Sequence, residues 1–312
     1  MAELFLNIQP YKKGYLPVGQ GHELYFELCG NPNGRPVLFV HGGPGAGCSK
    51  NARRFFDPKI FNAILFDQRG AGKSKPSGSL KANKTKNLVE DIRKLLKRLG
   101  IKKVFLFGGS WGSTLALCYA IKYPKTVAGM LLRGIFLANR HDTEFTYTGA
   151  AKEIFPEEYE KLFKLVPKRQ QKNFLQYYSK RIASKKKGWK KFASAFVEFE
   201  NSIMTLRQKK EKRKKSAAYF AFGAIESFFL ANNCFLPENY IFKNAHKLSG
   251  IPTTIVHGRY DLVCPASSAL ALHKAIKGSR LFFTIAGHAS REQETRSRLV
   301  QEMERAGKTI KW

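Results

Sequence analysis

The sequence of 312 residues contains no apolar run that approaches the roughly 20 residues needed to span a bilayer. Its first residues also lack a basic segment followed by an apolar stretch and a small-residue cleavage site, so we expect no signal peptide. Cysteine is scarce, and its odd, dispersed set without a CxxC pair indicates buried thiols in the cytoplasm rather than a disulfide framework or a zinc site. The five cysteines are Cys29, Cys48, Cys118, Cys234 and Cys264.

Acidic residues are also few. There are 23 Asp and Glu residues against 55 Lys and Arg residues, which gives a formal net charge of +32. One explanation is a protein that binds nucleic acid or an anionic membrane, because clustered Lys and Arg gain affinity by displacing counterions from phosphates. The other is an enzyme with a basic surface from a proteome of basic proteins. The motifs described next favour the second explanation, with no obligate nucleic-acid or membrane partner.

Short apolar segments alternate with helical patterns from about residue 20 to residue 140. Continuous apolar strands are typical of a parallel sheet that is covered on both faces. Apolar residues at helical spacing over residues 88–99 predict an intervening helix that ends at Gly100. We therefore expect an α/β fold with a mostly parallel, twisted sheet and helices on both faces. The strands expected in this part are Leu24–Leu28, Val37–Val40, Ala63–Phe66, Val104–Phe107 and Met130–Leu132.

The middle of the chain, residues 141–245, changes character. Lys and Arg are abundant there, strand signals fade, and apolar residues recur at helical spacing over residues 192–206. This pattern predicts a helical insertion that lies over the sheet edge as a cap. The basic run over residues 207–215 is expected to be a solvated helix face or loop rather than a nucleic-acid-binding arm.

The α/β pattern resumes after the helical insertion. Strands are expected over Thr253–His257 and Leu281–Ile285. We therefore expect a core domain formed by residues 1–140 and 246–312, which carries a cap domain of residues 141–245.

A glycine-rich turn, Gly108–Gly112, follows the strand expected at Val104–Phe107 and has the pattern G-x-S-x-G. Residues 113–121 after it have a helical pattern. In such a strand–turn–helix setting the serine is held above the sheet edge, and the glycines on both sides let the chain turn tightly. The N-terminus of the following helix favours developing negative charge. The pattern alone also occurs in ordinary turns, but this setting predicts that Ser110 is a catalytic nucleophile.

An acyl-transfer site also needs hydrogen-bond donors for the oxyanion. The loop His41–Gly45, with the sequence HGGPG, directly follows the strand expected at Val37–Val40. Where a serine sits in such an elbow, this loop supplies one backbone N–H group and the residue after the nucleophile supplies the other. We therefore expect the N–H groups of Gly43 and Trp111 to bind the oxyanion, and we expect His41 to be structural.

A serine nucleophile needs a base, and the base needs an orienting carboxylate. In the chain order that accompanies this motif, the acid and then the histidine follow the serine. Asp261 lies just after the strand expected at Thr253–His257, and His288 follows the strand expected at Leu281–Ile285 in the same way. We therefore expect both to form a triad with the serine. His257 is the main competitor as the base, but it precedes Asp261 and breaks the order.

Four segments carry motifs that occur together in a known family: His41–Gly45, Asp67–Ser74, Gly108–Leu117 and Leu132–Phe136. In this order they resemble the proline iminopeptidases, or prolyl aminopeptidases, of the α/β-hydrolase superfamily. The resemblance runs from about Tyr15 to His288. It implies an α/β-hydrolase fold with an inserted helical cap. It also implies a serine exopeptidase that needs no metal or other cofactor and releases N-terminal proline from peptides through an acyl-enzyme.

The resemblance further implies residues that recognise the free amine of the substrate. Residues 193–206 resemble a cap segment in which an acid follows two tryptophans. Here Glu200 takes the position of the acid, and Phe196 and Phe199 take those of the tryptophans. A second cap segment places Glu226 at its acid. The two glutamates are therefore expected to bind the amine, and the two phenylalanines to wall the pocket for the proline ring.

The residues themselves give a separate reason to consider these acids. Glu200 lies four residues after Phe196, so it falls on or beside an apolar helix face. A carboxylate there is costly unless it has a cationic partner, and the α-ammonium of a substrate would be one. Without the resemblance, an ion pair with a nearby lysine explains both acids more simply, and core packing explains the phenylalanines.

Two other functions stay open at this point. The same fold and triad could act on a different amide or ester. A non-enzymatic protein could instead use its basic cap to bind nucleic acid or a membrane.

Overall fold

A computed structural model describes residues 2–207 and 214–312. Its centre is an eight-stranded sheet with the strand order β1-β2-β4-β3-β5-β6-β7-β8. The strands are β1 (Lys12–Gly19), β2 (His22–Gly30), β3 (Arg35–Val40), β4 (Phe61–Phe66), β5 (Val104–Ser110), β6 (Val127–Ile135), β7 (Thr253–Gly258) and β8 (Arg280–Thr284). β2 pairs antiparallel with β1 and with β4, and the other neighbours pair in parallel.

Neighbouring residues of the central strands face two different cores. In β5, Val104 and Leu106 belong to one hydrophobic core, while Phe105 and Phe107 belong to the other. All four are buried, because helices cover both faces of the sheet. This two-sided burial explains why all four of these neighbouring residues are apolar. The mostly parallel α/β sheet expected from the sequence is confirmed.

Four helices cover the faces of the sheet. They are α1 (Thr85–Arg98), α2 (Trp111–Lys122), α10 (Ala266–Ala275) and α11 (Gln293–Thr309). The first three contribute side chains to one core, and α11 contributes to the other. α1 is the helix expected before Gly100, and that glycine follows its C-terminal end with a φ of 72°.

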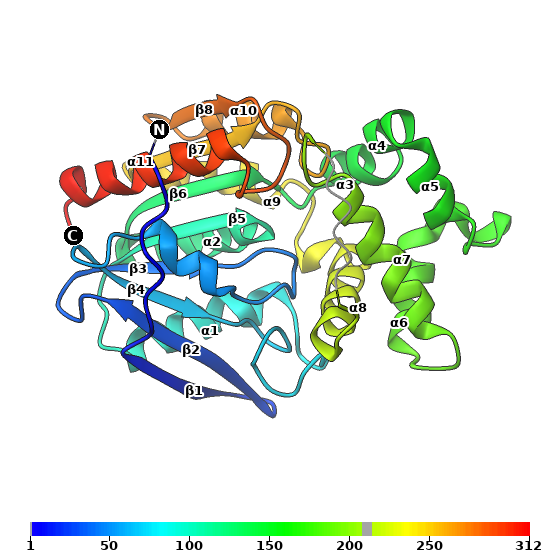
Figure 1. The fold of residues 1–312 in the computed structure, drawn as a ribbon, viewed down its shortest axis with the longest axis horizontal. Coiled ribbons are helices and arrows are strands. Elements are labelled where there is room, and N and C mark those ends of the chain that lie inside the picture. The colour runs from blue at the N-terminus through cyan, green and yellow to red at the C-terminus, as the bar shows by residue number, and fades with distance from the viewer. Residues whose placement is uncertain (1, 208–213) are drawn as a thin grey trace.

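A group of helices lies between β6 and β7 in the chain and at one end of the sheet in space (Figure 1). They are α3 (Arg140–Tyr147), α4 (Ala150–Ile154), α5 (Pro156–Phe163), α6 (Phe174–Ala183), α7 (Trp189–Ser202) and α8 (Ala217–Ala231), followed by the short α9 (Tyr240–Asn244). α8 packs against both α6 and α7. The helices expected in this segment are confirmed, whereas the division of the chain into a core and a cap domain stays a prediction.

The remaining helical segments among the described residues are short 3-10 helices of three to six residues. They span Lys50–Phe55, Pro124–Thr126, Lys168–Asn173, Asn233–Phe235 and Ala245–Leu248. Every strand expected from the sequence is present, but β1 was not expected. Only two of its residues, Leu16 and Val18, are buried.

No described helix is both long enough and apolar enough to cross a bilayer. All five cysteines lie in the described part of the chain, and none is bonded to another. Four of them are buried, and Cys48 is partly exposed. Most of the basic run that was expected to be a solvated helix face or loop, residues 208–213, lies outside the described residues.

Candidate active site

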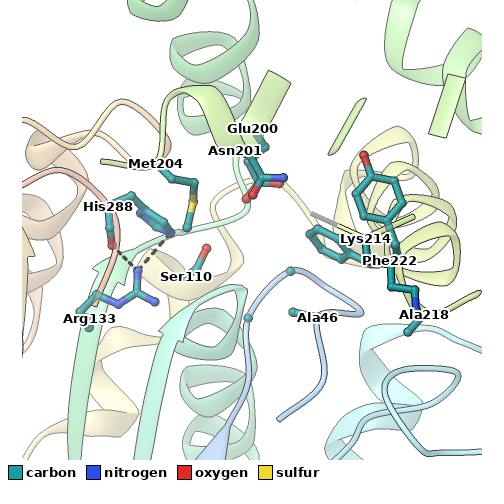
Figure 2. A pocket seen from close by; sticks show the side chains of 13 residues that line it. Ala46, Ser110, Arg133, Glu200, Asn201, Met204, Lys214, Ala218, Phe222 and His288 are labelled. Atoms are coloured by element: carbon teal, nitrogen blue, oxygen red, sulfur yellow. Dashed lines mark hydrogen bonds between the residues drawn. The ribbon is translucent and has the colours of Figure 1, made fainter. Parts of the chain in front are cut away.

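Ser110 lies between β5 and α2, at the turn that the sequence predicts. Its φ of 58° and ψ of −130° form a backbone conformation that residues other than glycine rarely adopt. The chain can turn this sharply because neighbouring positions lack side chains. A Cβ atom at Gly108 would lie 2.3 Å from the carbonyl oxygen of Gly112, and one at Gly112 would lie 2.1 Å from that of Val40. The turn presents Ser110 to a pocket at the carboxyl end of the parallel strands (Figure 2).

His288 and Asp261 meet at the ends of two neighbouring strands. Asp261 follows β7 and His288 follows β8, so the parallel pairing of these strands brings the two loops together. Nδ1 of His288 lies 2.7 Å from Oδ2 of Asp261. His288 and Ser110 line the same pocket. The structure therefore brings the three residues of the expected triad to one place.

Asp261 is held as a carboxylate. Its Oδ1 atom accepts hydrogen bonds from the backbone N–H groups of Val263 and Cys264, at 2.9 and 2.8 Å. Burial alone would raise the pKa of Asp261, but His288 and, to a smaller extent, His257 and the N–H group of Cys264 outweigh burial and lower that pKa below its usual range. Asp261 can therefore orient the imidazole and stabilise its positive charge.

A partly buried arginine that the sequence did not mark as functional contacts the imidazole. Nη1 of Arg133, in β6, lies 3.1 Å from Nε2 of His288 and 2.8 Å from the His288 carbonyl oxygen (Figure 2). A guanidinium only donates hydrogen bonds, so Nε2 accepts here and Nδ1 carries the proton directed at Asp261. This is the tautomer that a general base requires. The described contacts include no hydrogen bond between Ser110 and His288, and Arg133 holds the nitrogen that would accept it.

The two segments expected to supply oxyanion donors are joined by Gln68. Its side-chain N–H donates to the carbonyl oxygen of His41 at 2.8 Å, and its side-chain oxygen accepts from the indole N–H of Trp111 at 2.9 Å. Its backbone N–H donates to Nε2 of His41 at 2.9 Å, which gives His41 a structural role. Gly43 lines the same pocket as Ser110, and Trp111 begins α2, where backbone N–H groups lack acceptors within the helix. Both segments are thus fixed beside Ser110.

A second, smaller cavity opens beside Ser110. Gly43, Ser110 and Glu200 line both this cavity and the larger pocket, whereas Glu226 lines the smaller cavity only. The smaller cavity has a volume of about 30 Å³, against about 350 Å³ for the larger pocket. Its other lining residues are mostly apolar: Phe136, Thr143, Thr146, Tyr147, Leu230, Val263 and Cys264.

Glu200 of α7 and Glu226 of α8 bring two carboxylates to this cavity. Glu226 is buried. Oε2 of Glu200 is also buried and has no hydrogen-bond partner within the described part of the chain. Burial, and next the negative charges of Glu226 and Glu200, raise the pKa of Tyr147 well above its ordinary value, which indicates that both carboxylates lie near its ring. Two carboxylates in an apolar cavity form a favourable site for a cation.

Phe196 and Phe199 line neither of these two pockets. Both are buried, and their rings stack on Tyr147 with centroids 5.6 and 5.7 Å away. Tyr147, on α3, lines the smaller cavity instead. The two phenylalanines, which the resemblance implied to be the pocket wall, lie behind Tyr147. The reason is the orientation of α7. Its aromatic residues pack on other helices, as Phe196 does on Tyr178 of α6, whereas Glu200 near its C-terminal end reaches the cavity.

Several lining residues carry no local signal in the sequence. Arg133 lies in the segment Leu132–Phe136, which contributed to the family resemblance without a role of its own. Tyr147 reaches the cavity only through the packing of the helices. Among the described residues, no group of three or more His, Cys, Asp or Glu side chains has an arrangement that could hold a metal ion.

The sheet, the serine elbow and the aspartate–histidine pair define an α/β hydrolase. A family model described as the alpha/beta hydrolase fold matches residues 35–294. Among solved structures, a thermophilic esterase from Thermogutta terrifontis is similar with a TM-score of 0.65 at 19% identity, covering 94% of this chain and 97% of its own. An esterase from Exiguobacterium antarcticum has a TM-score of 0.64 at 20% identity, covering 95% and 99%. At these identities the similarity shows the fold alone.

Curated relatives show to which family of α/β hydrolases the chain is similar. A probable proline iminopeptidase of Leptolyngbya boryana is 40% identical over 311 residues, which cover 98% of this chain and 97% of the relative. The proline iminopeptidase of Arabidopsis thaliana is 41% identical and covers 96% of this chain and 82% of the relative. That of Xylella fastidiosa is 38% identical and covers 96% and 98%. The chain therefore belongs to the proline iminopeptidase family of α/β hydrolases, as the sequence motifs implied.

Proposed function

We propose that the protein is a serine aminopeptidase that releases proline from the N-terminus of peptides. The observation that carries this proposal is the buried Oε2 atom of Glu200, which has no hydrogen-bond partner among the described residues and belongs to the cavity that Ser110 also lines. A buried carboxylate oxygen without a donor is costly. The α-ammonium of a peptide would supply the donor and hold the first residue of the substrate beside Ser110. The names of the curated relatives support the same substrate.

In this mechanism Ser110 attacks the carbonyl carbon of the first residue. Nε2 of His288 takes the proton of the serine hydroxyl and returns it to the leaving amine, while Asp261 stabilises the imidazolium. The backbone N–H groups of Gly43 and Trp111 donate hydrogen bonds to the oxyanion. Water then hydrolyses the acyl-enzyme by the same route and releases proline.

The two carboxylates explain why cleavage would be restricted to the first peptide bond. An internal residue has no ammonium to place against Glu200 and Glu226, and a preceding chain would have to pass these buried side chains. The apolar lining of the cavity favours a small aliphatic ring. The cavity is small, with a volume of about 30 Å³. This small volume disfavours bulkier first residues.

Hydrolysis of proline β-naphthylamide by the purified protein tests the proposal. We expect Ser110→Ala to lose about 10⁴-fold or more in kcat, because the acyl-enzyme cannot form. The N-acetylated substrate should react about a hundredfold more slowly, because acetylation removes the ammonium and its charge-assisted hydrogen bonds. A p-nitrophenyl ester without an amine is the control for an intact triad. Unimpaired turnover by Ser110→Ala, or equal rates on blocked and free proline substrates, would contradict the proposal.

We further propose that the protein acts on free peptides in the cytoplasm, without an obligate nucleic-acid or membrane partner. Five unpaired cysteines support a reducing compartment. Fractionation of the native cells tests this, and recovery of most of the activity outside the cell or with membranes would contradict it.

A further inference from the structure

Ser110 lies where the smaller cavity and the larger pocket meet. Both are lined by Gly43, Ser110 and Glu200, whereas Glu226 lines only the smaller cavity and Lys214 only the larger pocket. If the first residue of a peptide occupies the smaller cavity, the part beyond the scissile bond must extend into the larger pocket. The larger pocket is therefore the place of the leaving peptide.

Lys214 brings a positive charge to this pocket. It lies just before α8, is exposed, and forms no ion pair with another described residue. In Figure 2 it lies across the pocket from Ser110 and His288. Arg133, a second cation of the lining, is on the side of His288 and donates its hydrogen bonds to that residue. Lys214 is therefore available to a ligand that reaches the far side.

Opposite charges thus stand at the two ends of the combined site. Glu200 and Glu226 are at the end that takes the ammonium, and Lys214 is at the end that the leaving peptide reaches. A volume of about 350 Å³ is near the lower limit of ligand pockets, which range over about 300–1,000 Å³, and gives room for about one or two residues. A carboxylate at or near the end of a short peptide would therefore come close to the lysine.

We propose that Lys214 determines specificity by binding a carboxylate of the leaving peptide, so that the preferred substrates are short peptides with a free or side-chain carboxylate one or two residues beyond the proline. This proposal rests on the proposed function. The C-terminal carboxylate and an acidic side chain would both form the same charge-assisted hydrogen bond with the lysine. Because the ammonium is exposed to solvent, the effect is modest, about fivefold in KM.

Three tripeptides that begin with proline test the proposal: Pro-Gly-Gly, its C-terminal amide, and the C-terminal amide of Pro-Gly-Glu. The matched control is the next residue, Lys215, which lies outside the larger pocket and forms an ion pair with Glu198 at 2.8 Å. KM and kcat are measured for the wild type and for Lys214→Met, Lys214→Arg and Lys215→Met.

In the wild type we expect a KM for Pro-Gly-Gly about fivefold below that for its amide. Lys214→Met should bring the two KM values together with little change in the kcat for the free acid. Lys214→Arg should restore the difference, and Lys215→Met should keep it. A lower KM for the glutamyl amide than for the glycyl amide would support the proposal in the same way and identify an acidic side chain as a second source of the carboxylate.

The failure of this proposal differs from the failure of the proposed function. If the wild type cleaves neither proline β-naphthylamide nor any of the tripeptides, the proposed function is wrong and the role of Lys214 is overturned with it. If the wild type releases proline from all three tripeptides with equal KM values, only the role of Lys214 is overturned. The role of Lys214 alone is also overturned if the lower KM for the free acid survives in Lys214→Met, or if Lys215→Met loses it to the same extent.

Discussion

Nη1 of Arg133 lies 3.1 Å from Nε2 of His288 and donates a hydrogen bond to the carbonyl oxygen of the same residue at 2.8 Å. The arginine therefore fixes both the ring and the backbone of the proposed base. Burial lowers the pKa of Arg133, and the negative charge of Asp261 opposes this. In the proposed mechanism Nε2 accepts the proton of Ser110, so the guanidinium would have to leave that nitrogen during the reaction, and its bond to the carbonyl could still hold the loop.

We expect Arg133→Met to lower the kcat for proline β-naphthylamide about tenfold or more. Methionine fills similar space but leaves the His288 carbonyl without its donor, so the imidazole is oriented less well. A hydrogen bond to a charged group contributes about 1.5–3 kcal/mol, and about 1.4 kcal/mol is a factor of ten in rate. Steady-state kinetics measure the effect, with Arg259→Met as the control because Arg259 is exposed and stacks on Phe283 at 3.6 Å. An unchanged or higher kcat would mean that Arg133 only blocks the base.

Gln68→Met should lower kcat more than it raises KM. Gln68 joins the loop after β3 to the indole of Trp111 through bonds of 2.8 and 2.9 Å, so its removal lets the two proposed oxyanion donors move apart. Donors aimed at the oxyanion act in the transition state, and the loss of one costs about 10²–10³ in kcat. A partial displacement should cost about ten- to a hundredfold.

The control for this change is Gln176→Met, because Gln176 is exposed and its side chain makes a long hydrogen bond of 3.4 Å to the carbonyl oxygen of Ala231. Thermal unfolding of both variants is measured alongside the kinetics. A Gln68→Met protein with lower thermal stability but full kcat would show that the glutamine only supports the fold.

The parts of this protein that the sequence predicts are those fixed by local rules. Residues Val104–Phe107 of β5 are all apolar because both faces of the strand are buried. The glycines of the elbow are required by close contacts: a Cβ atom at Gly112 would lie 2.1 Å from the carbonyl oxygen of Val40. Chain order then predicts Asp261 as the acid and His288 as the base before any geometry is known. Both follow parallel strands, and the ends of parallel strands meet at one edge of the sheet.

The parts that the sequence does not predict depend on packing between distant segments. β1 is an edge strand in which only Leu16 and Val18 are buried, and the proline between them weakens the strand signal. Arg133 gains its partner only when β6 is placed beside the loop after β8. Tyr147 of α3 lines the cavity, and its ring stacks on Phe196, which does not line it; periodicity along one helix cannot reveal this arrangement.

Glu200→Gln should raise the KM for proline β-naphthylamide about ten- to a hundredfold. The amide keeps the shape of the side chain but loses the negative charge that would pair with the α-ammonium, and a charge-assisted hydrogen bond contributes about 1.5–3 kcal/mol. The matched control is Glu198→Gln on the same helix, because Glu198 is exposed and pairs with Lys215 at 2.8 Å. If Glu198→Gln raised KM as much as Glu200→Gln did, the effect would come from the overall charge of the cap and not from recognition of the amine.

The stability of the fold should decrease below about pH 6.5, the ordinary pKa of histidine, because His257 is buried in its neutral form. Its Nδ1 accepts the backbone N–H of Ile135 and its Nε2 donates to the carbonyl oxygen of Cys264, both at 3.0 Å. Burial lowers its pKa, and the nearby Asp261 opposes this only in part. Between that lowered pKa and about 6.5 the unfolded chain binds a proton that the folded chain does not, so the free energy of unfolding falls as the pH falls, by up to about 1.4 kcal/mol per pH unit.

Denaturant unfolding of the wild type and of His257→Asn between about pH 5 and pH 8 checks this, with a flatter slope expected for the variant below about pH 6.5. The comparison uses the difference between the two proteins, because other buried groups also titrate. Burial raises the pKa of Asp142 to about 6, for example, so that its contribution increases as the pH falls and has the opposite sign. His246→Asn, a change at an exposed histidine, is the control and should follow the wild type. If His257→Asn lost stability with pH as steeply as the wild type, the acid sensitivity would arise elsewhere, for instance at His41, whose pKa burial also lowers.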